Sequence, residues 1–223
     1  TPQSGDVAKN LALFKEAYSY NSFGDSEITE QIVQTAVQIY NSPGLPDGIK
    51  QDFFNLAKTK IEQKIANSPH DARYLMFAGS LFNRTGNYNE AVKYLERALL
   101  ESPKKQTIYF ELGSSYMGNR DSSRMLEVFK KAYDLEPKSS ESKVIYFIGA
   151  IYTKNSAVLS NLIKEIGKDT IISDDRILGA YSSMGEYSKV IEILNSRLEK
   201  DPNNSQYKIS LASTYASIGQ KQQ

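Results

Sequence analysis

Hydrophobic residues recur along this chain with the spacing of α-helices. One predicted helix face carries apolar or small residues at i, i+3, i+4 and i+7, namely Leu75, Ala78, Gly79 and Phe82. A second helix face follows at Ala91, Leu95 and Ala98. Thr85-Gly86-Asn87 favours a turn between them, and Pro103 ends the second helix because the residue before a proline leaves the helical region. The pattern therefore predicts an antiparallel helix pair.

The same pattern returns after 34 residues. The residues that match at this spacing are Leu75 and Tyr109, Gly79 and Gly113, Phe82 and Tyr116, Leu95 and Phe129, Ala98 and Ala132, and further along Tyr181 and Tyr215. A fixed period of this length is typical of repeat architectures, in which each unit packs mainly on its neighbours. We predict an all-α fold, a right-handed solenoid of antiparallel helix pairs with about 12 helices.

The period divides the chain into units within one predicted helical-repeat domain, residues 1–223, which we expect to be truncated at both ends. The predicted units are 6–20 (partial), 21–71 with a long loop at 41–48, 72–105, 106–139, 140–170 (irregular), 171–204 and 205–223 (partial). Tyr116 and Tyr152 are 36 residues apart, whereas Tyr152 and Tyr181 are only 29 apart. We therefore expect a short second helix at 158–166, an irregular link at 167–170 and locally weak packing.

Small residues inside the predicted helices indicate close helix contacts. A glycine within a helix costs about 1 kcal/mol relative to alanine, a cost that a close approach of two backbones explains. The residues that carry the repeat signature are Gly79, Ala91, Ala98, Pro103, Gly113, Ala132, Pro137, Gly149, Tyr181, Gly185, Pro202, Tyr215 and Gly219. With these residues, the chain resembles the tetratricopeptide repeat over 72–105, 106–139 and 171–204. Arg120 and Met125 replace the usual Gly and Ala in the second of these windows.

The resemblance implies that a partner protein or peptide binds along the first helix of each pair. The expected groove residues are Met76, Ser80, Arg84, Phe110, Ser114, Met117, Tyr146, Ala150 and Lys154. Large apolar side chains in a groove suit an extended peptide or a helix; the alternative is that these side chains pack on one another. We expect the irregular unit to confine the groove mostly to residues 73–154. The basic residues beside it (Arg73 and Arg84, Lys143 and Lys154) are expected to form a solvated edge.

Composition excludes several classes of function. The net charge is +1, which argues against a nucleic-acid binder. The chain has no Cys and one His, His70, so we expect no metal or other cofactor. Asp174-Asp175 is interpreted as charge at a helix N-terminus rather than a catalytic pair. No apolar run is long enough to span a bilayer. We therefore predict no catalytic residues, no enzyme activity and no direct membrane insertion for this chain.

A more specific resemblance concerns residues 20–28, 72–84 and 106–113. These runs look like the repeat region that follows the membrane domain of bacterial O-antigen ligase-like proteins. That family transfers or polymerises lipid-linked glycans outside the cytoplasmic membrane, and its catalytic residues belong to the membrane domain. The resemblance implies an interaction module on the extracytoplasmic side of a bacterial membrane. Two alternatives stay open: a soluble cytoplasmic adaptor, and a groove that binds a glycan.

Overall fold

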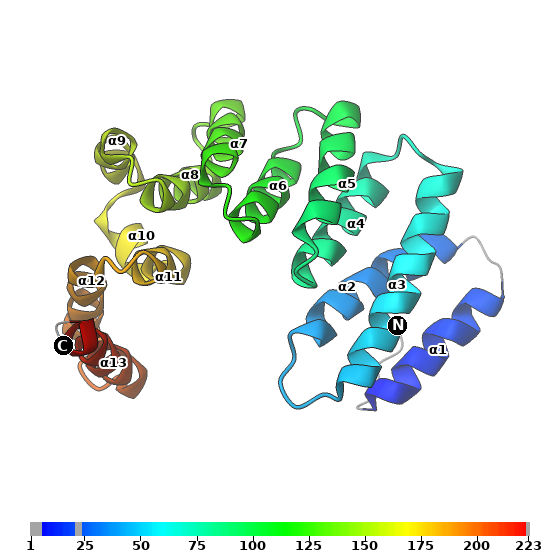
Figure 1. Cartoon of the computed structure of the whole chain (residues 1–223), viewed down its shortest axis with the longest axis horizontal. Coiled ribbons are helices and arrows are strands. Elements are labelled where there is room, and N and C mark those ends of the chain that lie inside the picture. The colour runs from blue at the N-terminus through cyan, green and yellow to red at the C-terminus, as the bar shows by residue number, and fades with distance from the viewer. Residues whose placement is uncertain (1–5, 21–23, 222–223) are drawn as a thin grey trace. The chain divides into compact units, whose positions relative to one another are not determined.

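The chain is built from helices alone over the residues that the computed structural model describes, 6–20 and 24–221. These residues form thirteen α-helices and no strand, which confirms the all-α prediction and adds one helix to the expected twelve. Residues 21–23, part of the run that resembles O-antigen ligase-like proteins, lie outside the described residues. The helices fall into two compact units, residues 1–128 and 129–223 (Figure 1), and each unit is described separately.

The first unit contains one leading helix, two complete helix pairs and the first helix of a third pair. Its helices are α1 (Val7–Ser19), α2 (Asp25–Tyr40), α3 (Asp47–Asn67), α4 (Ala72–Arg84), α5 (Tyr88–Glu101) and α6 (Gln106–Gly118). The first helices of the pairs, α2, α4 and α6, pack in sequence, and each second helix packs against the next first helix. The long loop falls at 41–46, since Asp47 and Gly48 already belong to the first turn of α3.

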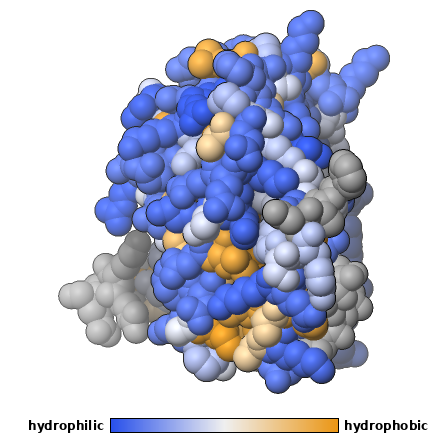
Figure 2. All heavy atoms as spheres, turned by 90° about the vertical axis from the view of Figure 1, so that its right-hand side faces the viewer, coloured by the Kyte–Doolittle hydropathy of each residue, from blue (hydrophilic) through white to orange (hydrophobic). Residues whose placement is uncertain are grey.

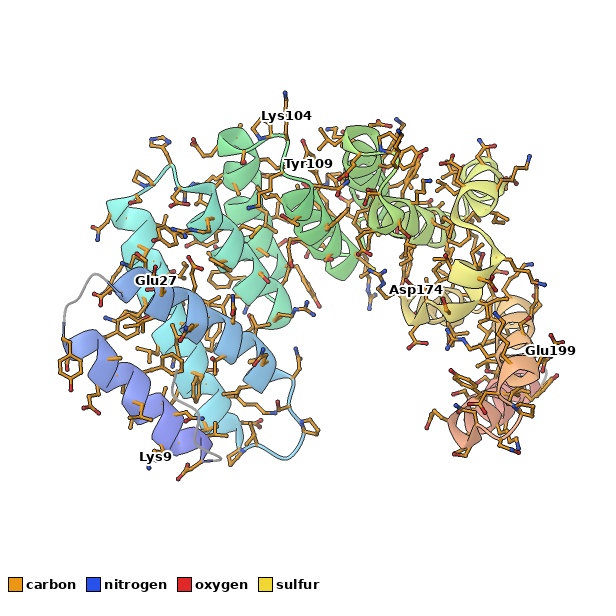
Figure 3. All side chains as sticks on the ribbon, turned by 180° about the vertical axis from the view of Figure 1, so that it is seen from behind. Lys9, Glu27, Lys104, Tyr109, Asp174 and Glu199 are labelled. Carbon is orange, nitrogen blue, oxygen red and sulfur yellow. The ribbon has the colours of Figure 1, made fainter. Side chains whose placement is uncertain are left out.

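The core of the first unit lies between the two layers of helices. Leu75 and Leu81 from α4, Leu95 from α5 and Ile108 from α6 are fully buried, each contributing about 1.5–3 kcal/mol through burial. The Phe82 ring stacks on Tyr94 with centroids 5.5 Å apart. Tyr109 begins the next pair, and its hydroxyl donates to the Pro103 carbonyl across the α5–α6 connection (2.9 Å; Figure 3). Figure 2, from the side of α1 and α3, shows a mainly hydrophilic face with hydrophobic atoms gathered in its lower part.

A backbone turn marks the same point of each repeat. The residue with positive φ between first and second helix is Gly86 (75°), Arg120 (59°), Lys154 (52°) or Gly185 (71°). These residues are 34, 34 and 31 positions apart. The interval that ends at Gly185 is therefore three residues short, and the five-residue shortening inferred from the spacing of Tyr152 and Tyr181 is wrong.

The buried positions of the first helices give the same register. On α6 they include Leu112, Gly113 and Tyr116, and the buried residues 34 positions later are Tyr146, Phe147 and Ala150 of α8 (Ser140–Tyr152). The counterpart of Tyr116 is thus Ala150 and not Tyr152. Gly149 is buried, but it corresponds to Ser115 and not to Gly113, so its assignment to the repeat signature is wrong.

The second unit departs from regular pairing after α9 (Ser156–Ile166). Its other helices are α8, α10 (Lys168–Ser173), α11 (Asp175–Ser183), α12 (Tyr187–Lys200) and α13 (Ser205–Lys221), while α7 (Ser122–Leu135) crosses the boundary between the units. Gly167 has φ 84° and separates α9 from α10. The predicted irregular link at 167–170 is therefore wrong beyond Gly167, because residues 168–173 are helical and Ile172 is buried among them. The boundary expected between residues 170 and 171 lies inside α10.

A buried arginine anchors the additional helix. Arg197 of α12 lies at the repeat position of Ala98 and Ala132, and its Nε donates to the carbonyl oxygen of Ile172 near the end of α10 (2.6 Å). Its Nη1 also pairs with Asp175 of α11 at 2.6 Å. The arginine thus satisfies a helix-end carbonyl that has no partner within its own helix.

The burial of the remaining signature residues depends on whether they lie in a helix or in a connection. Most of the small and aromatic ones are buried, namely Gly79, Ala91, Ala98, Gly113, Ala132 and Tyr181, whereas the prolines Pro103, Pro137 and Pro202 are exposed in the connections. Tyr215 and Gly219 are exposed on α13. Gly219 is the repeat counterpart of Gly185, but α13 continues through it as a helix. None of the described helices is both long and apolar enough to cross a membrane.

Candidate functional site

Six predicted groove residues lie on α4 and α6 in the first unit and are here called the first-helix face. They are Met76, Ser80, Arg84, Phe110, Ser114 and Met117. Met117 is 39% exposed and Arg84 is exposed, while the other four are half-buried. The face therefore presents three large apolar side chains that a partner can reach, Met76 on α4 and Phe110 and Met117 on α6.

A polar network beside these residues joins the two helices. The Asn83 side-chain amide donates to the Glu111 backbone oxygen (2.9 Å) and to its carboxylate Oε2 (3.0 Å). The Ser115 hydroxyl donates to Asn83 Oδ1 at 2.7 Å, and the Ser80 hydroxyl donates to Glu111 Oε1 at 3.4 Å. The network holds α4 against α6, and its polar groups form hydrogen bonds with one another. Sequence reasoning missed Asn83 and Glu111 as structural partners, because they are 28 residues apart in neighbouring repeats.

The predicted groove residues of the second unit lie elsewhere. Tyr146 and Ala150 are buried in α8, and Lys154 lies in the turn after that helix. The predicted register is also misplaced, but the corrected register gives the same result. The true counterparts of Phe110 and Ser114 are Val144 and Ile148, and both are buried. The Tyr146 ring packs on Tyr133 of α7, with the ring centroids 5.4 Å apart.

Most of the basic residues expected beside the groove are paired. Arg73 contacts Glu30 of α2 at 2.8 Å, and Lys143 contacts Glu165 of α9 at 3.7 Å. Lys154 lies 3.9 Å from Glu186. Arg84 makes no ion pair or hydrogen bond within the described part of the chain. These contacts favour a solvated edge with largely neutralised charge over an anion-binding surface.

The titratable groups serve structural roles. Asp174 caps α11 by accepting from the Arg176 backbone nitrogen at 2.9 Å (Figure 3), and the Arg176 side-chain hydrogen bond lowers the pKa of this carboxyl. Burial, together with a hydrogen bond to Glu96, raises the pKa of Tyr116 to about 12. His70 is exposed and lies 2.8 Å from Glu101. Among the described residues, no group of three or more His, Cys, Asp or Glu side chains is arranged to hold a metal ion.

The second unit contains a cavity of its own on the side of first helices α11 and α13. This cavity, about 460 Å³, is lined by apolar Leu178 and Ile209 and by small residues such as Gly179 and Ser213. Its residues fall outside 73–154. It therefore lies outside the range to which a ligand groove is expected to be mostly confined.

The chain matches known proteins in its repeat and in its fold. Residues 72–105 and 106–139 match the family model of the tetratricopeptide repeat. A tetratricopeptide protein of Parabacteroides merdae has 16% identity and a TM-score of 0.60, with 85% of this chain and 74% of that chain covered. A thermophilic tetratricopeptide protein of Thermus thermophilus has 18% identity and a TM-score of 0.54, with 84% and 99% covered.

A curated relative shares similarity over most of this chain. The homologue of BBSome complex member BBS4 from Drosophila melanogaster is 25% identical over 189 residues, which cover 76% of this chain and 38% of the relative. The chain thus spans less than half of that protein. Taken with the helix pairs and the 34-residue register, these matches show that this chain carries tetratricopeptide repeats at 72–105 and 106–139, within an array of helix pairs of the same fold.

Proposed function

We propose that this chain is a protein-interaction module that binds a segment of a partner protein on the first-helix face of α4 and α6. The observation that carries the proposal is the accessible apolar set Met76, Phe110 and Met117, lying beside a polar network whose groups already bond one another. Binding to a surface of this kind is stabilised mainly by the burial of apolar area, at about 25 cal/mol per Å². It offers few unpaired polar groups for a small polar ligand.

The network also gives the face a fixed geometry. Because Asn83, Glu111 and Ser115 hold α4 against α6, the apolar side chains need little rearrangement when a partner binds. Preorganisation of this kind reduces the entropic cost of association. An extended segment or an amphipathic helix with apolar anchors is the partner that fits such a surface.

The comparisons support an adaptor more than a membrane-enzyme appendage. The curated relative is named as a member of a protein complex, and the similar solved structures are tetratricopeptide proteins. They give no support to a glycan ligase or polymerase parent, or to a glycan as ligand. We therefore propose an adaptor or scaffold role, in which the module brings a partner protein into an assembly.

Affinity capture tests this proposal. The full chain is immobilised and exposed to lysate of the cells that produce it, and captured proteins are quantified by mass spectrometry. A triple variant, Met76→Ser, Phe110→Ser and Met117→Ser, should reduce a captured partner by at least about tenfold, equivalent to about 1.4 kcal/mol. Leu100→Ser is the matched control, because Leu100 is apolar and 81% exposed on α5.

Circular dichroism establishes that the variants stay folded. The proposal is rejected if the triple variant, with helicity preserved, retains every partner of the wild type. Loss of the same partners in Leu100→Ser would also contradict it, since that residue lies on a second helix and outside the proposed surface.

A further inference from the structure

One residue at a core position of the repeat is exposed. The 34-residue register places Ile61, Leu95, Phe129 and Ile163 at the same position of successive second helices, and the shortened unit continues the series with Leu194. Four of these side chains are at most 2% exposed, whereas Ile163 is 46% exposed. The sequence thus supplies a core residue at Ile163, and the structure leaves it accessible.

Two departures from the regular repeat accompany this exposure. Leu95 packs against Gly79 of α4, the first helix of its own pair, whereas the position of Gly79 is taken in α8 by the fully buried Phe147, which leaves less room for Ile163. In the first unit each second helix packs directly against the next first helix, as α5 does against α6. In the second unit α9 packs on α8 and α10, and α10 packs in turn on α11 and α12.

Two cavities lie on either side of the exposed isoleucine. One, about 320 Å³, is formed by α8, α9, α10 and α12, with Phe147, Ile171 and Ile193 among its apolar lining residues. The other, about 350 Å³, includes Ile151 and Leu159. Both are lined by Ile163 and Tyr181. Because the two cavities share these residues, they are here called together the α9–α12 groove.

The charges around the α9–α12 groove are positive in balance. Three lysines line the two cavities, and two of them face acids: Lys154 lies 3.9 Å from Glu186, and Lys189 lies 2.8 Å from Glu192. The ammonium of the third, Lys168, makes no ion pair or hydrogen bond within the described residues; the neighbouring Asp169, on which its charge also acts, is paired with Lys200 at 2.7 Å. The Lys168 ammonium is therefore available to a carboxylate from outside, next to an apolar surface that strengthens such a pair by excluding water.

We propose that the α9–α12 groove is a second binding site, which takes an acidic peptide segment carrying two large apolar side chains. The two cavities receive the side chains on either side of Ile163, and an Asp or Glu of the segment pairs with Lys168. The site is formed by residues of α8 to α12 in the second unit, and it shares no residue with the first-helix face of α4 and α6.

A displayed library of random 12-residue peptides provides the probe. Selection on the full chain should enrich peptides with at least two large apolar residues and more Asp and Glu than Lys and Arg. The binding of an enriched, fluorescein-labelled peptide is then measured by anisotropy. Ile163→Ser should weaken binding by about tenfold or more, and Lys168→Glu should weaken it severalfold and favour a peptide with its acids changed to Lys.

Control variants distinguish binding in the α9–α12 groove from binding elsewhere on the chain. Leu100→Ser and the triple variant of the first-helix face should leave binding of the peptide unchanged, so the failure of one proposal is distinguishable from the failure of the other. Both Ile163 and Lys168 are exposed, so their variants should retain wild-type helicity. The proposal is overturned if enriched peptides bind Ile163→Ser as tightly as wild type, or if the enriched pool is basic. A wild-type dimer that Ile163→Ser dissociates in sedimentation would also overturn it, in favour of a second copy as occupant.

Discussion

The glycine at the centre of α4 gives a sharp test of the packing argument. Gly79 is buried against α5, and a Cβ atom added there would lie 2.4 Å from Leu95 Cγ. Leu95 is fully buried, so its side chain has little room to move away. We predict that Gly79→Ala destabilises the chain, although the same change in an unconstrained helix is stabilising.

The magnitude follows from two opposing effects. Alanine gains about 1 kcal/mol over glycine in a helix interior through its higher helix propensity. Forcing an extra carbon into a well-packed core costs about 1–3 kcal/mol. The net change is therefore unfavourable by up to about 2 kcal/mol. Leu95→Ala removes the obstructing atoms, so Gly79→Ala should become favourable by up to about 1 kcal/mol in that background.

Urea denaturation followed by circular dichroism measures both changes, and Gly179→Ala serves as the control. Gly179 is helical, and a Cβ atom there would meet no heavy atom within 4 Å, so this variant should be more stable than wild type. If Gly79→Ala stabilises the wild-type chain as much as Gly179→Ala does, the close helix contact is refuted. The close contact is also refuted if Gly79→Ala still lowers the free energy of unfolding in the Leu95→Ala background.

Three further predictions concern the turns, a buried phenol and the irregular unit. Arg120 has positive φ, so Arg120→Gly should raise the free energy of unfolding by up to about 1 kcal/mol, whereas Gly86→Ala should lower it; unchanged urea midpoints would contradict this. The folded-state pKa of Tyr116 is raised to about 12 from 10, so its contribution to stability is present below pH 10 and lost towards pH 12. Tyr116→Phe should reduce the loss of the free energy of unfolding between pH 10 and pH 12. An identical pH profile of stability in the two proteins would argue against this role of Tyr116. Hydrogen exchange should be faster across 154–172 than across 72–102, and equal protection would refute local weakness of the irregular unit.

The helix pairs could be predicted from the sequence because their periodicity is local. Leu75, Ala78 and Phe82 recur with helical spacing, and the 34-residue period links them to their counterparts in the next pair. The register of α8 could not be predicted by matching one residue type. Tyr152 resembles Tyr116, but the buried counterpart is Ala150. The full set of buried positions decides the register, and a single aromatic does not.

Features that depend on contacts between repeats were also missed. The link between Asn83 and Glu111 joins two helices of different pairs, and nothing in either helix marks it. Helix α10 is too short to show a period, although Gly167 signals the break that precedes it. The residue type of Ile163 is the one expected in a core, so it does not signal the exposure; the signal lies in Phe147, which stands at the repeat position of Gly79 and Gly113.

Photocrosslinking tests the proposed interaction most directly. The photoreactive residue p-benzoylphenylalanine is placed at Met117 on the first-helix face, and in a second variant at Leu100 on α5, both of which are accessible apolar positions. Irradiation in the producing cells, followed by mass spectrometry, identifies the proteins in contact with each position. We predict a defined crosslinked partner at Met117 and none of that partner at Leu100. Crosslinks to the same proteins at both positions, or to a specific partner at Leu100 alone, would contradict a binding surface on α4 and α6.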